Sequence, residues 1–176
     1  MKTDVSRLNI LLIQNRQGTL SAVEQALESN NVRCQLLMVR VGPATLSYLR
    51  RKGPYAKVPA PDLVLFDLTD SDPKSIKILK AIKADKSCKS LSIVLLTRED
   101  CEEEVVKLTS KRSRESGFAP IELDGFTKAM KSFKTERFMH AVRLLEAFGY
   151  LLIRMPEIED DLSLQQTRKM TLQTGT

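Results

Sequence analysis

Asp67 and Thr97 each close a run of four apolar residues, and lysines follow later at positions 128 and 131. Brought to one edge of a sheet, these side chains could carry phosphoryl chemistry. A carboxylate can act as the nucleophile, a hydroxyl can hydrogen-bond a phosphoryl oxygen, and an ammonium can neutralise its charge. Because such residues are common at strand ends, the hypothesis depends on a fold that places them together.

The elements that must position these residues alternate between strand and helix. The predicted strands are 8–13, 32–39, 63–68, 93–96 and a short one between 121 and 133. Helical spacing of apolar residues follows them over 20–27, 43–52, 76–82, 105–108 and 138–153. Apolar runs without alternation are typical of strands covered on both faces. The order predicts an α/β, doubly wound, five-stranded parallel sheet.

Chemistry in such folds gathers at the carboxyl ends of the strands. The residues expected there are Gln14, Asn15, Asp67, Thr97 and a lysine between 128 and 131. Thr19, just before the first helical pattern, is expected to cap that helix.

Composition narrows the function classes. The 176 residues suit one domain, expected at 7–156 with a flexible tail at 157–176, and the net charge is +6. The sequence contains no apolar run of eighteen residues, no signal-peptide pattern, no C-x-x-C pair and no Gly-rich phosphate loop. Free thiols and the lack of a signal-peptide pattern favour a cytoplasmic protein, and the lack of a long apolar run favours one without a membrane span. His140 fits an ordinary helix face better than a nucleophilic pair.

Several longer blocks of the sequence resemble, in the same order, blocks of a known protein family. The blocks are 48–56, 60–68, 78–85, 93–97 and 136–156. Through them the chain resembles the receiver domain of two-component response regulators, most closely the single-domain regulators associated with phytochrome-type histidine kinases. The resemblance implies a flavodoxin-like receiver fold, a histidine kinase or other signalling protein as partner, and no enzymatic activity beyond autocatalytic aspartyl phosphorylation.

The resemblance also implies roles for the site residues. Asp67 falls on the phosphoacceptor position, and Thr97 on the hydroxyl that follows the phosphoryl group. Asp67 and the backbone carbonyl of Thr69 would bind Mg²⁺. Matching the last helix puts Lys131 on the family's lysine, whereas matching Asp124–Thr127 to the fifth strand favours Lys128. In both alignments the proline that normally follows is absent.

The largest departure lies at the first strand, where Gln14 and Asn15 replace the family's two acidic residues. Because Mg²⁺ prefers anionic oxygen, we expect metal binding to be weak. Asp70 or Asp72 could supply a substitute ligand, or simply be solvated. Two functions stay open: a stand-alone regulator phosphorylated on Asp67, and a pseudo-receiver that binds a partner or dimerises without phosphorylation.

An insertion near 112–123 is the second departure. The basic side chains beside it, Lys107, Lys111, Arg112 and Arg114, could bind an acidic partner or form a solvated helix end. No recognition-helix motif follows, so nucleic acid is not expected as a partner. The last helix is expected to extend through Phe148 to Ile153 and to form a homodimer contact.

Overall fold

Parallel strands form the centre of the computed structural model, which describes residues 8–70, 72–101, 120–132, 135–147 and 151–157. The strands are β1 (Leu8–Gln14), β2 (Cys34–Arg40), β3 (Leu63–Asp67), β4 (Ile93–Thr97), β5 (Ile121–Glu122) and β6 (Leu151–Arg154). They lie in the order β2-β1-β3-β4-β6-β5, and every adjacent pair is parallel. The predicted doubly wound parallel fold is confirmed, with six strands in place of five.

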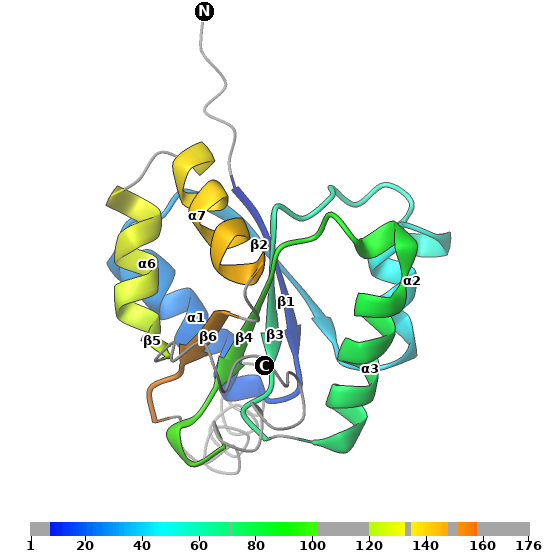
Figure 1. Cartoon of the computed structure of the whole chain (residues 1–176), viewed down its shortest axis with the longest axis horizontal. Coiled ribbons are helices and arrows are strands. Elements are labelled where there is room, and N and C mark those ends of the chain that lie inside the picture. The colour runs from blue at the N-terminus through cyan, green and yellow to red at the C-terminus, as the bar shows by residue number, and fades with distance from the viewer. Residues whose placement is uncertain (1–7, 71, 102–119, 133–134, 148–150, 158–176) are drawn as a thin grey trace, which may run out of the picture.

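Helices cover both faces of the sheet (Figure 1). They are α1 (Gln17–Ser29), α2 (Pro43–Leu49), α3 (Pro73–Ala84), α6 (Leu123–Ser132) and α7 (Thr135–Ala147). Three short 3₁₀ turns accompany them: η1 (Gly53–Tyr55), η2 (Lys86–Cys88) and η3 (Glu99–Cys101). The helices α1, α6 and α7 pack on one face, and α2 and α3 pack on the other.

The alternation of side chains along the strands builds a separate core under each layer of helices. Ile10 and Leu12 of β1 point toward α1, whereas Leu11 and Ile13 point toward α2 and α3. All residues of β3 and β4 are buried. This burial on both faces explains why these strands show continuous apolar runs, as parallel strands do.

The segment from 138 to 153 differs from its prediction as one long helix. Helix α7 ends at Ala147, and Leu151–Arg154 form β6, which pairs with β4 in the register Val94↔Leu151 and Thr97↔Arg154. Judged by periodicity alone, a short apolar run fits either a buried helix or a buried strand. Here the run forms a strand because it pairs with β4. Leu151, Leu152 and Ile153 are buried in the chain's own sheet. Leu151, Leu152 and Ile153 therefore offer no apolar surface for the homodimer contact expected through this segment.

The strand expected between 121 and 133 is present only as the two-residue edge strand β5. Helix α6 begins at the next residue, so that Lys128 and Lys131 lie on a helix and not after a strand. The strand beside β4, which the family's lysine would follow, is β6 and ends in Arg154. The prediction that places an amine from the last strand at this edge is therefore wrong for both lysines.

Some predicted features lie outside the described residues. They are the helix around 105–108, the basic residues at 107–114, most of the insertion, and the tail beyond 157. Within the described ranges, no helix is long and apolar enough to cross a bilayer.

Candidate functional site

Asp67 is the last residue of β3, at the carboxyl edge of the sheet. Its neighbours on both sides are core strands, since β1 pairs with β3 along Ile10–Ile13 and Asp67 itself pairs with Leu96 of β4. The residue is only 1% exposed. A buried carboxylate must be satisfied by donors or by a cation, because burial without a partner costs several kcal/mol.

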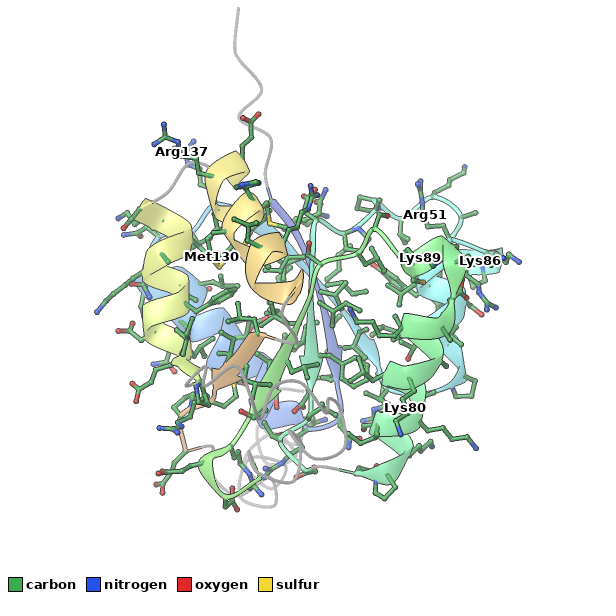
Figure 2. All side chains as sticks on the ribbon, viewed as in Figure 1. Arg51, Lys80, Lys86, Lys89, Met130 and Arg137 are labelled. Atoms are coloured by element: carbon green, nitrogen blue, oxygen red, sulfur yellow. The ribbon has the colours of Figure 1, made fainter. Side chains whose placement is uncertain are left out.

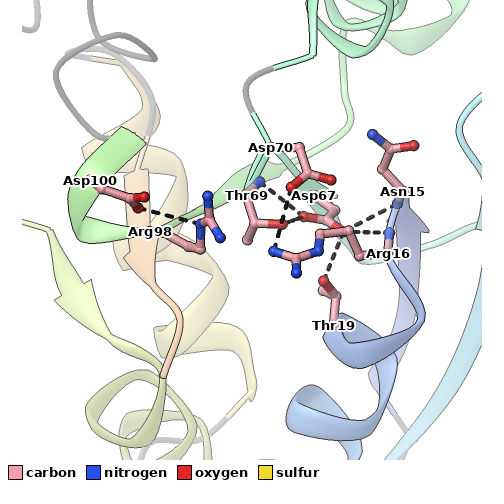
Figure 3. A network of polar contacts seen from close by, with 8 residues as sticks. All are labelled: Asn15, Arg16, Thr19, Asp67, Thr69, Asp70, Arg98 and Asp100. Carbon is pink, nitrogen blue, oxygen red and sulfur yellow. Dashed lines mark hydrogen bonds and ion pairs between the residues drawn. The ribbon is translucent and has the colours of Figure 1, made fainter. Parts of the chain in front are cut away.

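The chain itself supplies those donors (Figure 3). Oδ2 of Asp67 accepts hydrogen bonds from the backbone N–H of Asn15 (3.1 Å) and of Arg16 (3.2 Å), and from the Thr19 hydroxyl (2.8 Å). Oδ1 accepts from the Thr69 N–H (3.0 Å) and the Thr69 hydroxyl (2.6 Å). We call these five residues the Asp67 network. Both carboxylate oxygens are engaged by protein donors.

The geometry of the β1–α1 turn explains the donors on Oδ2. Arg16 has extended backbone angles and stands at the N-cap of α1, so that its N–H and that of Asn15, just before the helix, point toward Asp67. A helix N-terminus also carries partial positive charge and favours an anion there. The side chain of Arg16 makes no N-cap hydrogen bond. Thr19 lies inside the first turn and donates to Asp67, so its predicted role as the cap is wrong.

The side chain of Arg16 forms an ion pair with Asp70, which follows the Asp67 network along the chain. One guanidinium nitrogen lies 3.4 Å from an Asp70 carboxylate oxygen, and the Arg16 side chain is 14% exposed. Figure 3 shows this contact between the Arg16 guanidinium and Asp70. Arg98 and Asp100 form a second ion pair nearby, at 3.4 Å.

The side chains of Gln14 and Asn15 do not contact Asp67. Asn15 is exposed, donates through its backbone, and directs its side chain away from the carboxylate in Figure 3. Gln14 is 6% exposed, and its buried Oε1 makes no hydrogen bond.

Thr97 is adjacent to the network but not part of it. It follows Leu96, the residue that pairs with Asp67, and it is fully buried. Its hydroxyl donates to the carbonyl of Ile153 on β6, at 3.3 Å.

The two predicted lysines lie on the exposed surface of α6. Lys128 forms an ion pair of 2.8 Å with Asp124. That contact raises the pKa of Lys128 and, with a hydrogen bond from Asn30, lowers the pKa of Asp124. Neither lysine donates to Asp67, so the structure does not bring an amine from this region into the Asp67 network.

The residues present do not fit a Mg²⁺ site. Such sites rely on one or two carboxylates with free oxygen lone pairs, and Asp67 already accepts five hydrogen bonds. The candidate substitute ligands are engaged as well, because Asp70 pairs with Arg16 and Asp72 accepts from the backbone N–H of Lys74 as the N-cap of α3. Across the part of the chain that is described, no group of three His, Cys, Asp or Glu residues is arranged to hold a metal.

Known proteins share this architecture, although no protein-family model matches the chain. The response regulator Rcp1 of Synechocystis sp. is 28% identical over 97 residues, which are 55% of this chain and 66% of Rcp1. The phosphorylated cyanobacterial phytochrome response regulator RcpA is 25% identical with a TM-score of 0.52, covering 75% of this chain and 96% of RcpA. The bacteriophytochrome response regulator RtBRR gives the same identity and TM-score over 80% of this chain and 92% of its own.

The chain therefore shares the receiver fold of these response regulators and resembles them in sequence. The resemblance found in the sequence is thereby confirmed, and so is the parallel α/β fold that it implied. The structure adds that the Asp67 carboxylate is held in an internal network. Of that network, Asn15, Asp67 and Thr69 were expected from the sequence at this edge, whereas Arg16 was missed and Thr19 was expected only as a helix cap.

Proposed function

We propose that this receiver-type chain is a response regulator that works as a pseudo-receiver. It would act in phytochrome-associated two-component signalling as a protein-binding module, and its state would not depend on Mg²⁺-dependent phosphorylation of Asp67. One observation carries the proposal: the Asp67 carboxylate is 1% exposed and accepts five hydrogen bonds from its own chain.

Accessibility is the first physical reason. To attack a phosphoryl group, a carboxylate oxygen needs a free lone pair and open space in line with the leaving group. Oδ1 and Oδ2 of Asp67 offer neither in this arrangement. Releasing either oxygen would break charge-assisted hydrogen bonds worth about 1.5–3 kcal/mol each.

Charge is the second reason. Phosphoryl transfer depends on cations that offset the charge spread over the phosphoryl oxygens, normally including a metal ion. Gln14 and Asn15 bring no negative charge to attract a metal, and the guanidinium of Arg16 already faces this region. The site therefore supplies its own fixed cation where a metal-binding acidic pocket would be expected.

A second candidate function is phosphorylation of Asp67 by a histidine kinase. It is favoured by the position of Asp67 at the end of β3 and by the likeness to RcpA, a phosphorylated regulator. It would require Asn15, Arg16 and Thr19 to release Oδ2, or Thr69 to release Oδ1, before any phosphodonor could react.

Intact-mass measurement after incubation with acetyl phosphate, with and without Mg²⁺, separates the two candidates. The proposal predicts no added phosphoryl group on the wild-type chain. A Mg²⁺-dependent phosphoryl adduct on the wild type that is absent from Asp67→Asn would refute it.

A second variant tests the stated causes. Gln14→Glu with Asn15→Asp restores the acidic pair, and Thr19→Ala removes one donor from Oδ2. We expect the triple variant to gain labelling that a further Asp67→Asn change removes. If labelling stays absent although the triple variant is folded and binds Mg²⁺, then neither the missing acids nor the hydrogen bond from Thr19 explains the inactive site.

A further inference from the structure

Lysine and arginine side chains cover the surface formed by the end of α2, η1, α3 and η2. All of them are exposed: Arg50, Arg51, Lys52, Lys57, Lys74, Lys77, Lys80, Lys83, Lys86 and Lys89. We call this surface the basic face. Figure 2 shows Arg51, Lys80, Lys86 and Lys89 on the α2–α3 side of the molecule, opposite Arg137 of α7.

The charges of the basic face are largely uncompensated. Arg50 pairs with Asp85, whose carboxylate also accepts from Ser87. Helix α3 contains no acidic residue, and Asp72 is its N-cap. Among the described residues, no carboxylate pairs with the side chains of Arg51, Lys52, Lys57, Lys74, Lys77, Lys80, Lys86 or Lys89. So many unpaired like charges on one surface repel each other and attract a polyanion.

The lysines of α3 form a row that winds around the helix. They recur every third residue from Lys74 to Lys83, which at 1.5 Å per residue spans about 13.5 Å, and each step shifts the direction by about 60°. Lys86 and Lys89 extend the surface beyond the end of α3. A DNA duplex carries one negative charge per about 1.7 Å of its axis, so neighbouring lysines on one side of this row, such as Lys77 and Lys80, face several phosphates.

The composition of the basic face distinguishes among polyanions. Protein interfaces are rich in aromatic residues and Arg and poor in Lys, whereas this surface is mostly Lys. Anchoring in a membrane interface needs exposed apolar side chains next to the charges. The large exposed apolar residues of the described ranges are Met38, Ile121 and Leu144, none of which lies on α3 or η2. Lysines on an otherwise polar surface match contacts to nucleic-acid phosphates, which need charge and no sequence readout.

We propose that the basic face binds the phosphate backbone of double-stranded nucleic acid without reading its sequence. This activity is separate from the Asp67 network and holds whether or not Asp67 is phosphorylated. The expectation that nucleic acid is not a partner rested on the missing recognition helix, and backbone binding does not need one.

Fluorescence anisotropy with a labelled DNA duplex of about 20 base pairs tests the proposal, the length being chosen to exceed the row of lysines. We expect binding whose affinity falls as salt rises, with a slope of roughly 0.9 per phosphate contact. Replacing Lys77, Lys80 and Lys86 with Gln should weaken binding by on the order of tenfold per lysine that touches a phosphate, near 0.1 M salt. The salt slope should fall in parallel.

A matched control removes the same net charge elsewhere. Arg33, Arg137 and Arg143 are exposed and lie outside the basic face, and their replacement with Gln should leave affinity within about twofold, since only distant, screened charges change. Circular dichroism checks that both triple variants are folded. Equal weakening by the two triple variants would overturn the proposal. So would a wild-type chain that ignores the duplex, including one that binds only phosphatidylserine vesicles or poly-glutamate.

Discussion

Replacing Asp67 with Asn should destabilise the fold, and the sign of this change separates a structural carboxylate from an open phosphoacceptor. In an acidic pocket, neutralising one carboxylate relieves repulsion and leaves stability unchanged or higher. Here the carboxylate is surrounded by donors from Asn15, Arg16, Thr19 and Thr69. An amide in its place keeps one acceptor oxygen and directs an NH₂ group at the remaining donors.

The magnitude follows from that count of bonds. If the amide oxygen keeps the three donors from Asn15, Arg16 and Thr19, its nitrogen faces Thr69, whose hydroxyl can rotate to accept but whose buried N–H cannot. One orphaned N–H costs about 1–3 kcal/mol, and the other bonds lose their charge assistance. The expected loss in the free energy of unfolding is about 2–4 kcal/mol, or roughly 10 °C in Tm for a chain of this size.

Urea unfolding followed by circular dichroism measures this loss directly. The control is Asp70→Asn, which neutralises a carboxylate of the same region that is 39% exposed, and it should cost no more than about 1 kcal/mol. An Asp67→Asn variant as stable as the wild type, or more stable, would refute the reasoning that the carboxylate holds β3 to the start of α1.

Three further predictions concern other contacts. Thr19→Val keeps the shape of the side chain but removes one donor from Oδ2, and it should lower the free energy of unfolding by about 1.5–3 kcal/mol in urea titrations. Ile153→Ala should cost about 2–5 kcal/mol because β6 is a core strand, whereas Leu144→Ala, 53% exposed on α7, should stay within about 0.5 kcal/mol; equal effects would contradict the assignment of β6. Hydrogen bonds from Ser87 and Arg50 lower the pKa of Asp85 from 3.8 to about 2, so its stabilisation is present above pH 4 and is lost as the pH falls toward 2. Thermal unfolding of Asp85→Ala and the wild type should therefore differ at pH 6 and converge near pH 2, and a constant difference would exclude this linkage.

Much of the fold could be predicted because parallel strands leave a strong sequence signal. The continuous apolar runs of β1, β3 and β4 require cover on both faces, and that requirement leads to the doubly wound arrangement. The end of the chain could not be predicted in the same way. The apolar pattern of Leu151–Ile153 fits a helix and a strand equally well. These residues form a strand because they pair with the edge of β4.

The site was predictable in position but not in its contacts. The end of a buried strand locates Asp67, and the topology brings the β1–α1 turn next to it. Thr19 carries the same sequence signal whether it caps a helix or donates to a neighbouring carboxylate, so its role depends on the three-dimensional turn. The lysine was misplaced because the alignment assumed that residues 138–153 form one helix.

The central claim is that the chain's own donors saturate the Asp67 carboxylate and leave no place for a metal. The most direct test is a Mg²⁺ titration of ¹⁵N-labelled protein, followed through the amide resonances of Asn15, Arg16 and Thr69. The account predicts no saturable shift of these three resonances. Saturable shifts of all three that disappear in Asp67→Asn would contradict it.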